Sequence, residues 1–188
     1  MGLNDRSEPR QDRCRHGAYG DAALDRRRLL GALSLAGAGL ALPFGSIARA
    51  AGGTDALLLN CIDYRLTGKT TRYMMNHGMA GKYDQIVLAG AALGAKNDKF
   101  PAWGTTFWDH VQVALDLHHI HKVVIIDHRD CGAYKVILGE DLAGDPKKEF
   151  EVHAKQMRSL KDDIAKKYPQ LGVEMYLMAL NGSVETVA

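Results

Sequence analysis

The residues with the clearest potential for chemistry lie in two short strings, Cys61-Ile-Asp63-Tyr-Arg65 and His128-Arg-Asp-Cys131-Gly132. Thiolate and imidazole groups are side chains that zinc prefers as ligands. Cys61, His128 and Cys131 can therefore meet at one zinc ion. Three protein ligands leave the fourth corner of a tetrahedral ion open, which is typical of a catalytic rather than a structural zinc site.

Each string follows a run of apolar residues that is typical of a buried strand. The first run is Ala56-Leu-Leu-Leu-Asn60 and the second is Val123-Val-Ile-Ile126. In an open parallel sheet, ligands bind just beyond the carboxyl ends of the strands. Cys61 and His128 both fall at such an end, so the two strings are expected to converge at one edge of the sheet.

Strand-like and helix-like segments alternate along the chain after residue 51, which predicts an α/β fold: a single domain with a central, mainly parallel sheet flanked by helices. Apolar periodicity predicts strands over 56–61, 84–89, 122–127 and 173–180, and helices over 67–77, 105–119, 131–138 and 145–168. Gly78 is expected to end the first helix, and Pro146 to open the last one. The small-residue stretch 90–94 is interpreted as backbone that approaches the metal pocket closely.

The first fifty residues are typical of an export signal rather than of a folded domain. A twin-arginine string, Asp25-Arg-Arg-Arg-Leu-Leu30, precedes a short Gly/Ala-rich apolar run, and Ala48-Arg-Ala50 is a cleavage signal. We expect residues 1–50 to be a twin-arginine signal peptide and residues 51–188 to be the mature, periplasmic or otherwise exported domain. The apolar run is too short for stable membrane insertion, although an uncleaved anchor is the alternative.

The charge of the mature part argues against a nucleic-acid partner. The whole chain of 188 residues carries 24 Lys and Arg against 22 Asp and Glu, but residues 51–188 carry 16 against 17. Binding to nucleic acid would call for a basic face or stripe. A small molecule is the expected partner.

The two strings resemble those of the beta class of carbonic anhydrases, in which C-x-D-x-R carries the first zinc cysteine and H-x-x-C-G the other two ligands. The resemblance implies that Cys61, His128 and Cys131 hold Zn²⁺, and that Asp63 and Arg65 form the catalytic dyad. It further implies a zinc lyase, a carbonate dehydratase that reversibly hydrates carbon dioxide to bicarbonate by a zinc-bound hydroxide, and a homodimer or higher homo-oligomer.

In that mechanism the Arg65 guanidinium would hold Asp63 ionised and away from the metal. If the pair broke, Asp63 could become a fourth ligand and close the site. A plain ion pair that stabilises the turn is the alternative for Asp63 and Arg65. His77, His110 and Tyr134 are candidates for the proton carrier.

The chain also departs from the family pattern. The family's R-N-A-G string is replaced by Val87-Leu-Ala-Gly90, and only ten residues separate Ala50 from Cys61, too few for an N-terminal helical arm. Hydrolysis of another small linear molecule, such as carbonyl sulfide or carbon disulfide, is therefore an alternative. A zinc module without turnover and a domain with a Cys61–Cys131 disulfide are two more.

Overall fold

The computed structural model describes residues 53–142 and 144–188, so the predicted signal peptide lies outside the described residues. In chain order the elements are β1 (Ala56–Asn60), α1 (Thr67–Asn76), β2 (Tyr83–Val87), α2 (Ala91–Lys96), α3 (Pro101–His118), β3 (Lys122–His128), α4 (Gly132–Leu138), α5 (Pro146–Lys167), β4 (Gly172–Met178) and β5 (Val184–Thr186).

The strands of the described region form one sheet in the order β2-β1-β3-β4-β5. The first four strands run parallel, and β5 pairs antiparallel with β4. The predicted fold class, an α/β domain with a mainly parallel sheet, is confirmed. Since β1 and β3 are direct neighbours, the segments that follow them leave the sheet side by side.

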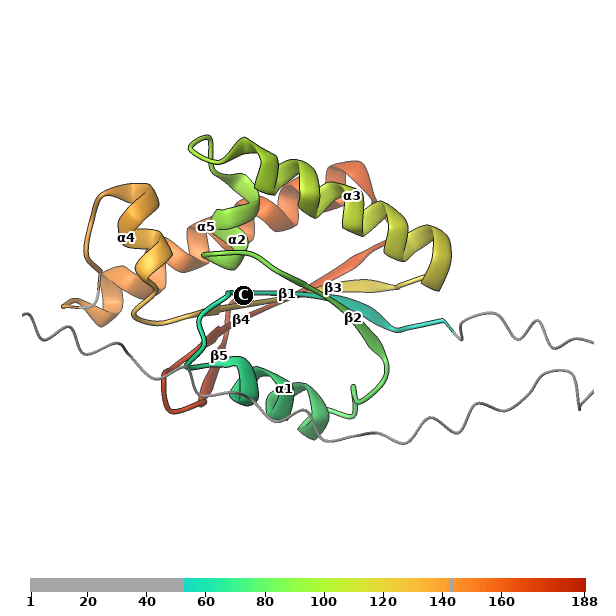
Figure 1. The fold of residues 1–188 in the computed structure, drawn as a ribbon, viewed down its shortest axis with the longest axis horizontal. Helices are drawn as coiled ribbons and strands as arrows, with labels where there is room; N and C mark the ends of the chain where they lie inside the picture. Colours follow the sequence, from blue (N-terminus) through green and yellow to red (C-terminus); the bar gives the residue numbers. More distant parts are fainter. Residues whose placement is uncertain (1–52, 143) are drawn as a thin grey trace, which may run out of the picture. The chain divides into compact units, whose positions relative to one another are not determined.

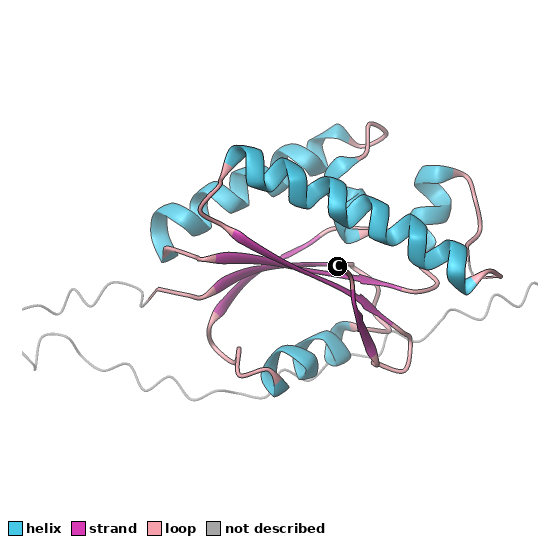
Figure 2. Ribbon diagram, turned by 180° about the vertical axis from the view of Figure 1, so that it is seen from behind, coloured by secondary structure: helices cyan, strands magenta, loops and turns pink. Residues whose placement is uncertain are grey.

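Helices cover both faces of the sheet (Figures 1 and 2). Helix α1 lies on one face, and α2, α3 and α5 lie on the other. A parallel sheet needs this cover because its strands are apolar on both faces. Every residue of β1 and all but the first of β3 are buried.

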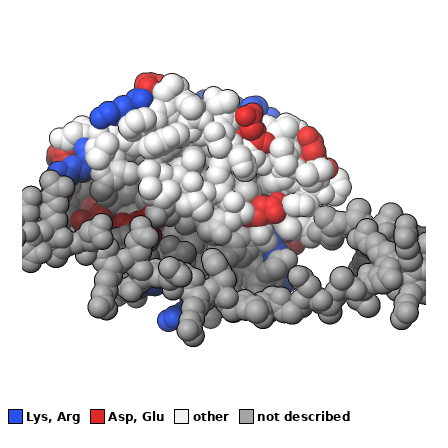
Figure 3. Space-filling view, viewed as in Figure 1, with Lys and Arg blue, Asp and Glu red and all other residues white. Residues whose placement is uncertain are grey.

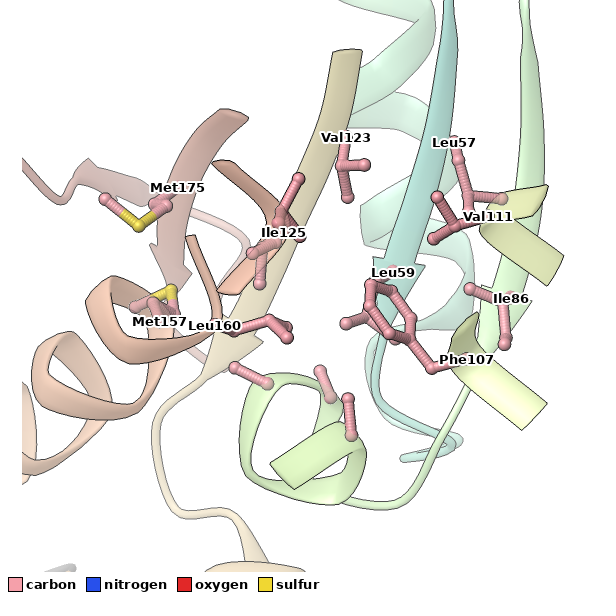
Figure 4. Close-up of a cluster of buried hydrophobic side chains, with 14 of the residues drawn as sticks. Leu57, Leu59, Ile86, Phe107, Val111, Val123, Ile125, Met157, Leu160 and Met175 are labelled. Carbon is pink, nitrogen blue, oxygen red and sulfur yellow. The ribbon is translucent and has the colours of Figure 1, made fainter. Parts of the chain in front are cut away.

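The larger hydrophobic cluster fills the space between the sheet and α2, α3 and α5 (Figure 4). Leu57 and Leu59 of β1 point into it together with Phe107 of α3 and Leu160 of α5. Burying each such side chain contributes about 1.5–3 kcal/mol. A smaller cluster on the other face packs Met74 of α1 against the sheet. The strands that carry the metal-site strings are thus fixed from both sides.

The ends of two helices follow the predicted signals. The Asp145 side chain caps α5 by accepting hydrogen bonds from the backbone N–H groups of Lys147 and Lys148, at 3.1 and 3.0 Å. Pro146 is the first residue of the helix. Gly78 follows the end of α1 with a φ of +72°, a conformation that glycine adopts readily.

The structure differs from the sequence prediction at three places. Residues 91–96 form helix α2, which was not predicted as an element, α3 begins at Pro101, and β5 was not predicted. The expected close approach of this stretch to the metal pocket is present at Gly90, whose N–H lies 3.3 Å from Cys61 Sγ. Three of the six residues of α2 are alanine, the residue with the highest helix propensity. Gly94 lies inside this helix because a Cβ there would be 2.4 Å from the carbonyl oxygen of Ala89. Glycine occupies position 94 because α2 packs closely against the backbone of Ala89 there.

Within the described part of the chain, none of the helices combines the length and the apolar character needed to cross a membrane. On the face drawn in Figure 3, charged atoms are scattered over a mostly uncharged surface, and the described residues form no continuous basic patch there.

Candidate metal centre

The carboxyl ends of β1 and β3 bring the two strings together. Asn60 of β1 is paired with Ile126 of β3, so Cys61 and His128 leave the sheet within a residue or two of each other. Cys131 follows at the amino-terminal end of α4. One potential ligand atom from each of these three residues lies within 4.8 Å of the other two, and all three residues are buried. Among the described residues, these three form a cluster of His and Cys side chains that could hold a metal ion.

The distance between the two sulfur atoms fits a shared metal ion. Cys61 Sγ and Cys131 Sγ are 3.9 Å apart, and both cysteines are free. Zinc–sulfur bonds of about 2.3 Å at a tetrahedral angle would place the two sulfurs about 3.8 Å apart. A disulfide would require about 2.05 Å. The structure therefore shows two thiols at a metal-binding spacing, not the disulfide of the alternative reading.

The imidazole of His128 is oriented for a ligand. Its Nδ1 is 2.9 Å from the carbonyl oxygen of Arg129, and therefore carries the proton that it donates to that oxygen. Its Nε2 is buried and has no hydrogen-bond partner within the described part of the chain. A buried polar atom without a partner is costly. Metal-bound histidines commonly donate the other ring N–H to a carbonyl in this way.

The thiols also fit a cation. A hydrogen bond from Cys131 lowers the pKa of the Cys61 thiol to about 4, against the effect of burial, and the Gly90 N–H, 3.3 Å from Cys61 Sγ, helps. The same interaction, together with burial, raises the pKa of Cys131. Two thiolates this close repel each other. A bound divalent cation would allow both to ionise.

Asp63 and Arg65 form a bidentate pair beside these residues. Arg65 Nε is 3.0 Å from Asp63 Oδ1, Arg65 Nη2 is 2.7 Å from Asp63 Oδ2, and the backbone N–H of Arg65 donates to Oδ1 at 2.9 Å. These hydrogen bonds lower the pKa of Asp63 to about 2. Asp63 Oδ2 lies 3.8 Å from His128 Nε2. The carboxylate is ionised and close to the position of a metal.

Arg65 has a second partner that the sequence did not suggest. Its Nη1 donates to Asp130 Oδ2 at 2.7 Å, and its Nη2 donates to the Asp130 carbonyl oxygen at 2.9 Å. Asp130 has a φ of +57°, a conformation in which Asn and Asp are enriched among residues other than glycine.

A buried polar network lies behind the centre, and it too was missed. The Asp127 carboxylate, 1% exposed, accepts hydrogen bonds from the Ala92 N–H at 3.0 Å, from the Tyr134 hydroxyl at 2.5 Å and from His153 Nδ1 at 2.9 Å. The signal was an acidic residue that ends a fully apolar strand, directly before a histidine. Such a charge needs several donors when buried.

A largely apolar cavity of about 270 Å³ opens beside the cluster. Cys61, Cys131 and Asp63 contribute to its lining, together with Ala89, Phe100, Trp103, Ala133, Val136 and Ile137. Phe100 and Trp103 stack with ring centres 4.3 Å apart. Phe107 is fully buried, Trp108 packs against the core, and Trp103 contributes to both core and pocket.

The proton-carrier candidates do not lie in this cavity. His77 and His110 are outside its lining, and each donates a hydrogen bond from Nδ1 to the backbone carbonyl of the residue four positions earlier. Tyr134 is 1% exposed, and burial together with the Asp127 charge raises its pKa well above the usual value. Tyr134 is thus a hydrogen-bond donor inside the protein.

The fold and the centre define an α/β protein with a buried Cys-His-Cys cluster at the carboxyl edge of a parallel sheet. The chain belongs to the family described as "Putative carbonic anhydrase", whose model matches residues 51–188. Two curated relatives, both described as uncharacterized, come from Rickettsia. The protein from Rickettsia conorii is 39% identical over 133 residues, 71% of this chain and 72% of its own length. The protein from Rickettsia bellii is 37% identical over 133 residues, 71% and 81% of the two chains.

Solved structures with a similar arrangement of the chain include two from fungi. One is reported among tetrameric beta-carbonic anhydrases from Sordaria macrospora, with 11% identity, a TM-score of 0.49 and coverage of 73% of this chain and 82% of that chain. Another is a carbonic anhydrase from Glaciozyma antarctica, with 14% identity, a TM-score of 0.47 and coverage of 77% and 87%.

Proposed function

We propose that this protein is a zinc lyase that catalyses the reversible hydration of carbon dioxide to bicarbonate. The observation that carries the proposal is the convergence of Cys61, His128 and Cys131 within 4.8 Å, directly beside an Asp63 carboxylate that Arg65 holds in place. Membership of a carbonic anhydrase family supports it.

Cys61 Sγ, His128 Nε2 and Cys131 Sγ would hold the zinc ion. When bound, zinc supplies an electrophilic centre that makes water a nucleophile near neutral pH. The Gly90 N–H donates to the Cys61 sulfur, and the Arg129 carbonyl fixes the ring of His128. These two contacts hold the donor atoms in place before the metal arrives, so little reorganisation is needed.

Asp63 would accept a hydrogen bond from the attacking water. The hydrogen bonds from Arg65 lower the pKa of Asp63 to about 2, so its carboxyl group is ionised at pH 7. It therefore orients the nucleophile as an acceptor and does not store the proton that the reaction releases. Arg65 keeps the carboxylate in this orientation through two nitrogens, which a single point charge could not do.

The apolar cavity would receive carbon dioxide. Carbon dioxide has no net charge or dipole, and the walls of the cavity offer it aromatic and aliphatic side chains. The same walls exclude water from the reacting atoms. Since the histidine candidates lie elsewhere and Tyr134 is buried, we propose that the released proton passes to buffer at the mouth of the cavity.

The lining of this cavity also supports a second candidate, hydrolysis of carbonyl sulfide or carbon disulfide. No lysine, arginine or asparagine contributes to the cavity among the residues described, and a linear, uncharged molecule with a polarisable sulfur atom would also be suited to such walls. A module without turnover is the remaining reading of a metal-loaded site. Parallel assays on the same zinc-loaded preparation distinguish these three possibilities.

The proposal extends to assembly and export. Ile62, Tyr64 and Val136, near the cavity, are exposed to 63%, 86% and 57%, and burying them against a second copy would favour a homodimer or higher homo-oligomer. The twin-arginine string is the basis for proposing a periplasmic or otherwise exported protein. Cell fractionation and the mass of the exported form test the second proposal.

The decisive experiment combines zinc quantification with a stopped-flow assay of carbon dioxide hydration between pH 7 and 9. We expect about one zinc per chain and a rate far above that of buffer. Asp63→Asn should keep its zinc and lose most of the rate, since the amide has one acceptor oxygen and one NH₂ donor where the carboxylate has two acceptor oxygens. A zinc-loaded wild-type protein that does not exceed the buffer rate would refute the proposed activity.

A further inference from the structure

The guanidinium of Arg65 is held from two sides. Two of its nitrogens, Nε and Nη2, bind the carboxylate of Asp63. Nη1 donates to Asp130 Oδ2 at 2.7 Å, and Nη2 also donates to the Asp130 carbonyl oxygen at 2.9 Å. Since all three nitrogens are bound, the plane of the guanidinium cannot turn without breaking a hydrogen bond.

Asp130 is itself held in place by a buried group. Its backbone N–H donates to Glu149 Oε1 at 2.5 Å, and Glu149 is 4% exposed. Arg129 Nη1 donates to the other oxygen of Glu149 at 3.1 Å. This support fixes the backbone of Asp130 in a left-handed conformation, with a φ of +57°. The backbone of Asp130 is therefore fixed, and its half-exposed carboxylate is oriented by the hydrogen bond from Arg65 Nη1.

The contact joins the two loops that carry the ligand residues. Arg65 lies four residues after Cys61, and Asp130 directly precedes Cys131. Asp63 Oδ2 is only 3.8 Å from His128 Nε2, so a modest rotation of Asp63 would bring its oxygen to the position of a bound metal. The hydrogen bonds from Arg65 to both carboxylate oxygens of Asp63 oppose this rotation.

We propose that Asp130 is a positioning residue: it accepts from Arg65 Nη1, fixes the plane of the guanidinium and so keeps Asp63 out of the fourth coordination position. The inference rests on the proposed function, because it concerns the corner where water and substrate would bind. Asp130 itself touches neither.

Charge alone predicts the opposite effect of removing Asp130. The Asp130 carboxylate competes with Asp63 for one positive charge, and without it Arg65 would attract Asp63 more strongly. Two substitutions separate geometry from charge. Asp130→Asn keeps an acceptor oxygen and tolerates a positive φ, whereas Asp130→Gly removes the acceptor and suits the same backbone conformation.

The test uses the cobalt(II)-substituted protein, titrated with thiocyanate at constant pH and followed by visible absorption. Thiocyanate binds only where the fourth position is free of Asp63. Its apparent Kd is therefore the intrinsic Kd divided by the fraction of molecules with a free position. We expect Asp130→Gly to weaken thiocyanate binding about threefold or more, as this fraction falls to about a third. Asp130→Asn should stay within about twofold of the wild type.

Asp162→Asn is the control for a changed net charge, since Asp162 is exposed on α5. Arg65→Lys keeps the positive charge but lacks the planar guanidinium group, so it should weaken thiocyanate binding as Asp130→Gly does. If Asp130→Gly does not fold, Arg65→Lys takes its place in the test.

Three results would overturn the inference. One is wild-type thiocyanate affinity in Asp130→Gly or, if that variant does not fold, in Arg65→Lys. Another is an Asp130→Asn variant as weak as Asp130→Gly, which would show that an acceptor oxygen at this position does not sustain thiocyanate binding. A wild-type protein that binds no cobalt would refute the metal centre itself, and with it the proposed function. Cobalt binding with equal affinities in all variants would refute the role of Asp130 alone.

Discussion

Tyr134 donates its hydroxyl hydrogen to Asp127 Oδ2 across 2.5 Å, and both side chains are 1% exposed. The same carboxylate accepts from His153 of α5 and from the Ala92 N–H of α2. Three helices thus meet at one charge, at the residue directly before His128. The position of α4, and with it that of Cys131, depends on this network.

Removing the shared acceptor should therefore cost far more than removing one donor. Asp127→Ala leaves three buried donors without a partner, and we expect it to lower the free energy of unfolding by about 3–5 kcal/mol. Tyr134→Phe removes one hydrogen bond and should cost about 1–2 kcal/mol. Urea denaturation of the zinc-loaded variants measures both. Equal losses would show that the network does not act through Asp127.

A second prediction concerns the coupling of metal and fold. Cys131→Ser replaces a thiolate by a hydroxyl that binds zinc poorly, so zinc content should fall below about a tenth of the wild-type value and the Tm should fall with it, because metal affinity is partly folding energy. Metal analysis and thermal unfolding check this. In the presence of a strong chelator the wild type should approach the variant. An unchanged zinc content would exclude Cys131 as a ligand.

Much of the fold was predictable because it depends on periodic apolar patterns. The four parallel strands and the helices α1, α4 and α5 were predicted within about two residues of their observed ends. Strand β5 was missed because three residues at a sheet edge have little pattern, and α2 was missed because its glycine suggested a loop.

The residues of the candidate site were predictable only where they belong to a short sequence motif. Cys61, Asp63, Arg65, His128 and Cys131 follow strands, and the topology brings the ends of β1 and β3 together. Asp130, Glu149 and His153 could not be assigned from the sequence, because their partners lie 19 to 65 positions away. The left-handed backbone of Asp130 and the burial of the Glu149 carboxylate can be recognised only when the tertiary packing is known.

Gly94 offers a test of the packing that the sequence concealed. A Cβ at this position would lie 2.4 Å from the carbonyl oxygen of Ala89 and 3.3 Å from the Cβ of Leu88. Although alanine favours helices by about 1 kcal/mol over glycine, the clash with backbone must shift α2. We expect Gly94→Ala to lower the free energy of unfolding by about 1–3 kcal/mol. Gly68→Ala, in α1, has nothing within 4 Å of the new Cβ and should be neutral or stabilising. Urea denaturation compares the two variants, and a more stable Gly94→Ala would contradict the close approach.

The Asp63–Arg65 pair gives a pH dependence with a definite sign. The hydrogen bonds from Arg65 lower the pKa of Asp63 from 3.8 to about 2, so the folded state favours the ionised form. The resulting stabilisation is fully present above about pH 4 and is lost as the pH falls through about 2. The difference in stability between the wild type and Asp63→Asn, both reduced and free of metal, should therefore be constant from pH 5 to 7 and shrink towards pH 2. Urea denaturation at each pH measures it, and a difference that grows on acidification would contradict the assignment.

The cavity should control turnover without controlling folding. Val136 is 57% exposed and lines the cavity, and a tryptophan there would obstruct the path to the two cysteines. We expect Val136→Trp to lower kcat/KM for carbon dioxide hydration by about tenfold, about 1.4 kcal/mol of transition-state stabilisation. Zinc content should stay at the wild-type value. Val113→Trp is the matched control, because Val113 is 53% exposed on α3 but lies outside this cavity. Equal rates in the two variants would mean that substrate reaches the metal by another route.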